Sequence, residues 1–423
     1  MRSTPRFVAI VAVVFCAASA RAVNLDWLTQ YKKPNIHYGQ LELHPYYQLS
    51  EVYDSNIYLV PRDQPGRTVG GGVRGSWITV NELALETLLP WRRLHSLATG
   101  YDFQAKNYST QAYLNDTINQ TAHMDYAYAG AYGLTFKAGD QYANTTDQAF
   151  SELIERNRRW TNRVYTQLDY NPERGWFAGG VDAAHTAIKY LGPTIARQLN
   201  RVEDTAGFNV GYKVAPKTKL YASYHRTIIH YSVHRELPDQ DKDNKAHDLG
   251  FGVSGVISPK VSGQIEGGMT YREYDEAPIG AGGVTRVTRN FTAATNLLYK
   301  ATEATDFTFA ASRRLEESIS STNRFYISNN VSLDVKHKMP RKLAVGANIA
   351  YGVDKYPDTQ VVVTGTRGDR RDDLYQGGVW VEYDIQQWLS TGLSYVFRER
   401  NSTFSGEFNY QDQQTAWNVA LKF

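Results

Sequence analysis

Cysteine is almost absent from this sequence, because Cys16 is the only one among 423 residues. It lies in a short apolar run near the N-terminus, and Val14-Phe15 ahead of it lacks the small residue of a lipoprotein signal. Beyond that run, no stretch is apolar enough to cross a membrane as a helix. These absences exclude disulfide-stabilised domains, thiol enzymes and helical membrane proteins.

The sequence also lacks an excess of one charge once its N-terminus is considered. Arg2 and Arg6, the apolar run Phe7 to Cys16 and the A-x-A pattern Ala20-Arg21-Ala22 together predict a cleaved signal peptide. An uncleaved anchor is the alternative, but the run is too short to span a bilayer. The chain has 46 Lys+Arg and 43 Asp+Glu, so removal of Arg2, Arg6 and Arg21 leaves 43 of each. This neutral balance argues against a nucleic-acid partner.

Aromatic residues, by contrast, are abundant. The chain has 30 Tyr and 8 Trp, although its mean hydropathy is only −0.48. Tyr and Trp rings suit a membrane interface, because each has an apolar body and a polar tip. An exported chain that is polar overall yet rich in such rings is typical of a transmembrane β-barrel.

Alternation of apolar and polar residues with a period of two supports this interpretation. It is clearest at the C-terminus, where one strand face would carry Trp417, Val419, Leu421 and Phe423, and the other Gln414, Ala416, Asn418 and Lys422. The same pattern recurs at residues 261–272, 330–336, 343–354 and 379–386. Lipid would contact the first kind of face and water the second.

Turn signals predict how the strands connect. Short turns are expected at residues 171–175, 215–217, 258–260 and 338–341, and long polar loops at 143–159, 190–202, 232–246, 276–286, 355–372 and 399–412. Short turns on one rim and long loops on the other are typical of outer-membrane barrels. We predict a single antiparallel up-and-down meander of about 18 strands. Sixteen or 20 strands are the alternatives, because Leu83, Leu85 and Leu88-Leu89-Pro90 fit no single register.

The expected organisation has three parts: a signal peptide, a short periplasmic N-terminal segment and the barrel, at residues 1–22, 23–40 and 41–423. A soluble β-sandwich is the alternative fold, but it rarely needs so long a chain in one domain. A β-helix would show a short repeat, and we find none.

Motifs of enzymes and metal sites are weak or missing. No Gly-x-Ser-x-Gly, His-Glu-x-x-His or P-loop pattern occurs, so we expect neither an enzyme nor a cofactor. A catalytic site assembled on the outer rim from distant residues stays an alternative. Asp239, Asp241 and Asp243 are weak candidates for a metal site, but the spacing of an EF-hand fails at Asn244. His225, His230 and His234 cluster near the same loop.

Charged residues on the polar strand faces are predicted to line a wet lumen. They are Lys106, Asp125, Lys137, Glu266, Arg272, Asp334, Lys336, Glu382, Asp384, Arg398 and Arg400. Arg398 and Arg400 could bind carboxylates or sugar hydroxyls, or form salt bridges with Glu382 or Asp384 on the neighbouring strand. The two interpretations can coexist.

Three segments resemble the putative β-barrel porin 2 family. They are Tyr47 to Tyr58 (YQLSEVYDSNIY), Tyr395 to Ser402 (YVFRERNS) and the terminal Val419 to Phe423 (VALKF). The resemblance covers nearly the whole mature chain, although residues 78–93 match no part of it. It implies an outer-membrane barrel of a kind often linked to exopolysaccharide export. It also implies that the face of Trp417, Val419, Leu421 and Phe423 is the signal read by the barrel-assembly machinery.

The predicted function is an aqueous conduit across the outer membrane of a Gram-negative bacterium, with a periplasmic C-terminus. Export of an exopolysaccharide is the favoured use, because a neutral wall with aromatic rings would let a sugar chain slide. A general diffusion porin is the main alternative, and a structural barrel is another. Expected partners are lipid, lipopolysaccharide, the assembly machinery and a periplasmic polysaccharide-export protein.

Overall fold

The computed structural model describes most of the chain from Ile36 onward. The described ranges are 36–61, 72–146, 157–192, 199–232, 242–275, 286–318, 323–360 and 367–423. The predicted signal peptide and most of the predicted periplasmic segment lie outside them. Within these ranges, no helix has the length and apolar character needed to cross a membrane.

Nearly all of the regular structure is β-strand. The first half contains β1 (Ile36–Tyr38), β2 (Leu41–Asp54), β3 (Ser76–Trp91), β4 (His95–Tyr108), β5 (Thr117–Ala129), β6 (Leu134–Thr145), β7 (Arg159–Tyr170), β8 (Phe177–Tyr190) and β9 (Arg201–Ala215). The second half contains β10 (Thr218–Tyr231), β11 (Asn244–Ser258), β12 (Val261–Tyr274), β13 (Val287–Lys300), β14 (Thr305–Glu317), β15 (Phe325–Met339), β16 (Leu343–Gln360), β17 (Arg367–Asp384), β18 (Leu389–Ser402) and β19 (Tyr410–Lys422). Single helical turns form α1 (Ala112–Asn115), η1 (Ala131–Gly133) and α3 (Ser405–Phe408).

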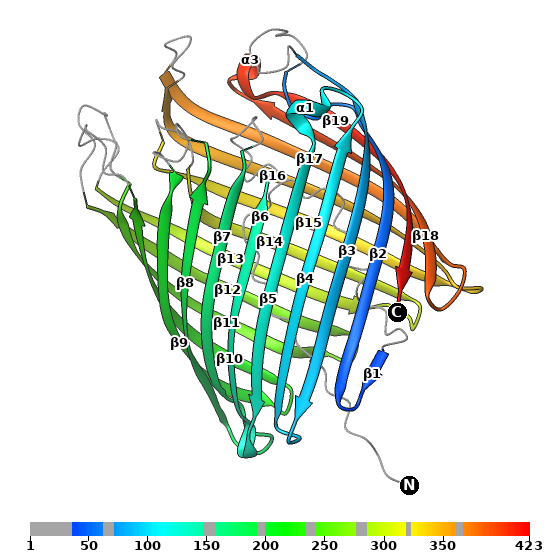
Figure 1. The fold of residues 1–423 in the computed structure, drawn as a ribbon. Helices are drawn as coiled ribbons and strands as arrows, with labels where there is room; N and C mark the ends of the chain where they lie inside the picture. The colour runs from blue at the N-terminus through cyan, green and yellow to red at the C-terminus, as the bar shows by residue number, and fades with distance from the viewer. Residues whose placement is uncertain are drawn as a thin grey trace.

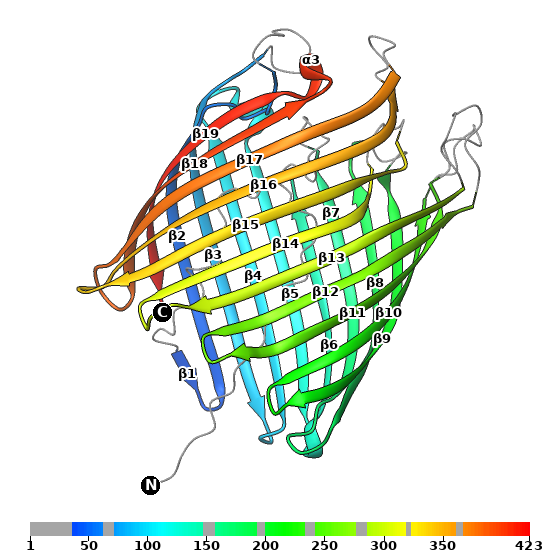
Figure 2. The ribbon, with the colours of Figure 1, turned by 180° about the vertical axis from the view of Figure 1, so that it is seen from behind.

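Strands β2 to β19 form a closed barrel of 18 antiparallel strands, each paired with its neighbours in sequence. Closure comes from β19 pairing with β2, from Gln414 beside Asp54 to Lys422 beside Tyr46. Figure 1 shows β2 to β8 on the near wall, and Figure 2 shows β10 to β18 on the opposite wall. The predicted all-β meander of 18 strands is therefore confirmed.

Strand β1 lies outside the count of 18. It pairs with Leu41–Leu43 at the start of β2, below the stretch of β2 that pairs with β19. It therefore extends the wall beneath the C-terminus (Figure 1). A strand inside the segment predicted to be periplasmic was not expected from the sequence.

The connections alternate in length as predicted. Strand bounds leave two to six residues at each turn on one rim, and six to 21 at each loop on the other. All four predicted short turns are confirmed. Two predicted long loops are wrong in their extent. Strands β16 and β17 run to Gln360 and from Arg367, so residues 361–366 replace the predicted 355–372, and β18 and β19 leave residues 403–409 in place of 399–412.

The stretch that fitted no single register forms one regular hairpin, β3–β4, with its turn at residues 92–94. Leu83, Leu85 and Leu89 all face outward and are 37–58% exposed, whereas Leu88 has the opposite parity. Pro90 is tolerated because it lies at the end of the strand beside the turn. Leu88 is an apolar residue at an inward position, so it interrupts an otherwise regular alternation of apolar and polar residues.

One pair of neighbouring strands separates before it reaches the loop rim. Strands β13 and β14 pair only from Ala293 beside Arg313 down to Lys300 beside Asp306. Above that point β13 pairs with β12 as far as Val287, and β14 pairs with β15 as far as Glu317. The upper end of β14 is therefore free to leave the line of the wall.

Candidate functional site

The polar strand faces form the concave inner wall of the barrel. Side chains on this face reach across an intervening strand, as Tyr165 of β7 does when its hydroxyl donates to Asp125 of β5 over 2.5 Å. Similarly, His225 Nε2 of β10 lies 3.2 Å from Asp182 of β8, and Lys422 of β19 donates to Glu382 of β17 over 3.3 Å. Such contacts require convergence, which only the inner surface of a closed sheet provides. This face is the lumen wall.

All eleven charged residues proposed from the sequence occupy those alternate strand positions whose side chains point into the lumen, which we call inward parity. Lys106, Asp125, Lys137, Glu266, Arg272, Asp334, Lys336, Glu382, Asp384, Arg398 and Arg400 come from β4, β5, β6, β12, β15, β17 and β18. Several are strongly buried, with Arg398 6% and Arg400 1% exposed. Arg398 does not pair with Glu382 or Asp384, because its guanidinium donates to Asp412 of β19 over 2.6 Å. Their functional roles stay predictions.

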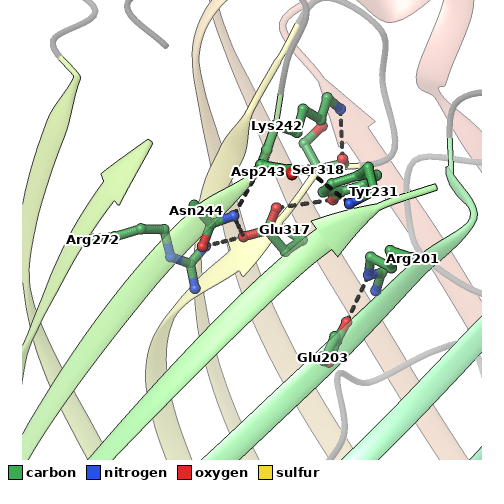
Figure 3. A network of polar contacts seen from close by, with 9 residues as sticks. All are labelled: Arg201, Glu203, Tyr231, Lys242, Asp243, Asn244, Arg272, Glu317 and Ser318. Atoms are coloured by element: carbon green, nitrogen blue, oxygen red, sulfur yellow. Dashed lines mark hydrogen bonds and ion pairs between the residues drawn. The ribbon is translucent and has the colours of Figure 1, made fainter. Parts of the chain in front are cut away.

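The upper end of the β14–β15 hairpin, residues 314–318 and 323–327, folds into the lumen and is called the mouth tip here. Glu317 has outward parity on β14, yet its carboxylate accepts a hydrogen bond from Arg272 of β12 over 2.5 Å. It also accepts from Tyr231 of β10 and from Asn244 of β11, each over 3.1 Å (Figure 3). These three partners lie on the inner wall, so the outer face of the mouth tip packs against the inner face of β10 to β12.

Two further contacts fix the mouth tip in this position. Leu315 and Phe325, which also have outward parity, are buried with Tyr274 of the inner wall in one apolar cluster. Lys242 donates to the carbonyl oxygen of Ser318 over 2.8 Å (Figure 3). The separation of β13 from β14 allows this inward bend, and the bend narrows the mouth of the lumen.

A second inward element follows β2. Residues 55–61, called the N-terminal mouth segment here, bury Ile57 and Val60 against Ile78, Val80 and Tyr108 of the inner wall. The hydroxyl of Tyr58 is held by Gln111 and Asn115, beside and within α1, over 2.8 and 2.9 Å. The mouth is therefore narrowed from the side of β2 to β4 as well.

The third inward element is α3, between β18 and β19. The guanidinium of Arg370 lies between the rings of Tyr356 and Phe408, 4.3 and 3.4 Å from their centroids. Arg400 donates to the carbonyl oxygen of Phe408 over 2.5 Å. The described residues thus place three inward elements at the loop rim, each held by buried contacts.

Two segments that carried the family resemblance meet where the barrel closes. Asp54 accepts from Gln414 of β19 over 2.7 Å, and Asn56 donates to the carbonyl oxygen of Gln411 over 3.1 Å. The carboxylate of Asp412, which is fully buried, accepts hydrogen bonds from both Ser55 and Arg398. These residues, more than 340 positions apart in sequence, hold the seam and anchor the N-terminal mouth segment.

The weak metal candidates do not form a site among the described residues, which contain no group of three or more potential metal-ligating side chains. Asp239, Asp241 and His234 lie outside the described ranges. Asp243 accepts from the backbone N–H of Tyr231 over 2.7 Å. His225 and His230 lie five residues apart on β10 and therefore face opposite sides of the wall, so these two side chains do not share one site.

The residues of the predicted assembly signal lie together on the outward face of β19. Trp417 is 47% and Phe423 42% exposed, and the ring of Phe423 stacks on Trp388 with a centroid distance of 6.1 Å. Val419 and Leu421 lie between them on the same face. Their recognition by an assembly machinery stays a prediction.

The aromatic rings expected on the lumen wall are present in the structure. Tyr46, Tyr165, Tyr221 and Trp380 are half-buried on the inner wall. The hydroxyl of Tyr221 donates to Glu266 over 2.5 Å, and Lys336 lies 5.9 Å from the Trp380 centroid. The alternation at residues 379–386 had already assigned Trp380 to this face, whereas Tyr46, Tyr165 and Tyr221 are located by the strand registers.

Comparison with protein families gives one decisive match. The model of the family described as putative beta-barrel porin 2 matches residues 162–423, which is more than half of the chain. The chain belongs to this family. The porin is thus an integral outer-membrane β-barrel with a transport role, and proteins of this kind are typically not enzymes. The match does not extend to Tyr47–Tyr58, where part of the resemblance was seen.

No curated protein sequence matches the porin. Solved structures resemble the porin at low similarity. OccAB4 from Acinetobacter baumannii is 10% identical, with a TM-score of 0.45 and coverage of 91% of this chain and 99% of that chain. The siderophore receptors PirA from Acinetobacter baumannii and Pseudomonas aeruginosa are 9% and 7% identical, each with a TM-score of 0.43. They cover 93% and 90% of this chain, and 81% and 80% of their own chains.

Proposed function

We propose that this porin is a conduit for export of a neutral or weakly charged polysaccharide across the outer membrane. The observation that carries the proposal is the lumen wall, which combines half-buried aromatic rings with carboxylates and amides. Tyr221 with Glu266 and Gln264 is one such group, and Tyr165 with Asp125 is another. An aromatic face can stack on the apolar face of a sugar while neighbouring polar groups bond its hydroxyls.

The balance of charges supports a substrate without strong charge. Inner cations are offset by nearby acids, as in Arg398 with Asp412, Lys422 with Glu382 and Arg272 with Glu317. An anion-selective pore would instead need a ring of uncompensated basic side chains. Because the charges on the wall are paired, they do not bind a long sugar chain strongly at any one position.

Blocking of ion current by oligosaccharides tests the sugar-binding wall. We expect added neutral oligosaccharides to reduce the current through the purified porin in planar bilayers. Tyr221→Ala should weaken this block about tenfold, because loss of one stacking and hydrogen-bonding contact removes about 1.4 kcal/mol of binding. Tyr224→Ala is the matched control, since Tyr224 lies on the same strand but faces outward. If oligosaccharides block wild type and Tyr221→Ala equally, the lumen wall no longer supports the proposed export function.

General diffusion of small solutes is the second candidate, because paired charges also suit a weakly selective porin. Deletion of the gene separates the two functions. Export predicts loss of surface polysaccharide with unchanged uptake of small solutes, together with dependence on a periplasmic polysaccharide-export protein as partner. A general porin predicts slower uptake with normal surface polymer. If neither quantity changes, both proposals are wrong.

A further inference from the structure

The outward face of strands β10 to β17 carries a row of basic residues near the loop rim. The row consists of Arg226, Lys245, Arg289, Arg313, Lys355 and Arg371, from β10, β11, β13, β14, β16 and β17. Strand register relates Arg226 to Arg289 through two intervening residues: Arg226 pairs with His247, His247 with Tyr271 and Tyr271 with Arg289. Lys355 pairs with Arg371. We call these six residues the basic row.

Aromatic side chains lie immediately below the basic row. Tyr224, Phe291, Tyr351 and Tyr375 each stand two or four positions closer to the short-turn rim on the same strand as a cation. The guanidinium of Arg289 lies 5.7 Å from the Tyr271 ring centroid. Outward Tyr and Phe rings mark the level where acyl chains give way to polar headgroups. The basic row therefore lies at the level of the headgroups.

Half of the basic row forms no ion pair among the described residues, although Glu273 and Asp373 lie on the same outward face. Lys245 pairs with Asp275 and Arg371 with Asp373, over 3.2 and 2.9 Å, and Arg313 donates to Asn329 and Asn290. Among the described residues, Arg226, Arg289 and Lys355 form no ion pair. All three are exposed. Their donors are available to a ligand from the membrane.

The other half of the barrel differs at the same level. On the outward face of β2, β6 and β9, the charged groups are the acids Glu51, Asp140 and Asp204. Each is satisfied by a neighbour: Thr79 donates to Glu51 and Asn162 to Asp140, and His185 pairs with Asp204. On the strands of this half, the outward cation is Lys189 of β8, whose ammonium lies 5.1 Å from the Trp160 ring centroid. Outward cations are thus more numerous on β10 to β17 than on β2 to β9.

We propose that the basic row is a binding site for the phosphate groups of lipopolysaccharide in the outer leaflet. Guanidinium and ammonium groups at headgroup level form charge-assisted hydrogen bonds to phosphate, and each contributes to retention of an anionic lipid. The site is distinct from the lumen and independent of the transported substrate. The proposal requires that the loop rim faces the cell surface, because the basic row would then lie in the outer leaflet.

Titration of the detergent-solubilised full chain with purified lipopolysaccharide tests the site. The triple variant Arg226→Gln, Arg289→Gln and Lys355→Gln should bind at least about tenfold more weakly, since three cations available to phosphate are lost. A control triple variant, Arg174→Gln, Lys217→Gln and Lys260→Gln, loses the same charge at the short-turn rim and should bind like wild type. Heat-modifiable mobility in gels verifies that all variants fold.

Two further probes identify the ligand group. Dephosphorylated lipopolysaccharide should bind wild type as weakly as native lipopolysaccharide binds the triple variant, and phosphatidylglycerol should bind more weakly than lipopolysaccharide. Equal affinity of wild type and triple variant, or an equal loss in the control, would overturn the proposal. Equal binding of phosphatidylglycerol would show a general anionic surface instead. Because the titration is done in detergent, a wrong orientation cannot mimic any of these results.

Discussion

At the scale of single residues, Glu317 decides the position of the mouth tip. Its carboxylate is the acceptor shared by Arg272, Tyr231 and Asn244, three side chains from three different strands. Arg272 and Glu317 are both 9% exposed, so neither charge can be compensated by bulk water. Loss of the carboxylate would leave a buried guanidinium without its counter-charge, which is strongly unfavourable.

We predict that Glu317→Gln releases the mouth tip while the barrel persists. Single-channel conductance in planar bilayers should rise, and unfolding in urea should show a loss of about 1–3 kcal/mol. Glu273→Gln is the control, because its pair with Arg286 is exposed and should contribute less than about 1 kcal/mol. Unchanged conductance in Glu317→Gln would mean that the tip does not limit the pore.

A second residue-scale prediction concerns the two faces of β16. Val345 faces outward toward lipid, whereas Asn348 faces the lumen. Val345→Arg should be the more costly change, by up to about 2–4 kcal/mol when measured by folding into bilayers, because a cation that faces lipid is poorly solvated. Asn348→Arg, three residues away, should cost much less because water reaches it. If Asn348→Arg costs more than Val345→Arg, the outward and inward faces of β16 are assigned wrongly.

At the scale of elements, closure of the barrel depends on β19. This strand forms twelve residue pairs with β18 and nine with β2. On its inner face Gln414 bonds Asp54 and Asp412 receives Arg398, while its outer face ends in Phe423 against Trp388. The strand therefore has two separable features, an inner seam that stabilises and an outer aromatic face exposed at the membrane.

Deletion of Phe423 separates these features. We expect periplasmic accumulation and low surface levels in cells, with the unfolding free energy of the purified, refolded barrel little changed. The reason is that Phe423 lies beyond the last residue of β19, where its ring stacks on Trp388 and its backbone adds one hydrogen bond to Pro45. Cell fractionation and refolding measure the two quantities. Normal surface levels of the shortened chain would contradict a role in assembly.

At the scale of the whole molecule, the difference between the two rims predicts orientation. We expect the loop rim at the cell surface and the short turns, with the C-terminus, in the periplasm. Tyr113 in α1 and Tyr132 in η1 are 85% and 87% exposed at opposite rims. Since Cys16 is the only native cysteine, Tyr113→Cys should react with an impermeant maleimide on intact cells, and Tyr132→Cys only after permeabilisation. The opposite labelling pattern would mean that the barrel has the opposite orientation in the membrane.

The fold was accessible from the sequence because it depends on local periodicity. Alternation at residues 343–354 and the turn at Ser258-Pro259-Lys260 each specify a strand face or a reversal without reference to distant residues. Once the strands alternate and connect in order, an up-and-down barrel is the arrangement that leaves no open edge. The hairpin at residues 78–96 was the weak point, because Leu88 interrupted the pattern with an inward apolar side chain.

The sequence by itself therefore determined the barrel, its two faces and the charges along its lumen. Only the tertiary structure decided how the mouth is built. Glu317 and Leu315 have the parity of outward residues, yet they pack inward because β14 separates from β13 above Ala293. Asp54 and Asp412 meet only when β19 reaches β2. Such contacts depend on convergence of distant strands on a concave surface, which no period of two can encode.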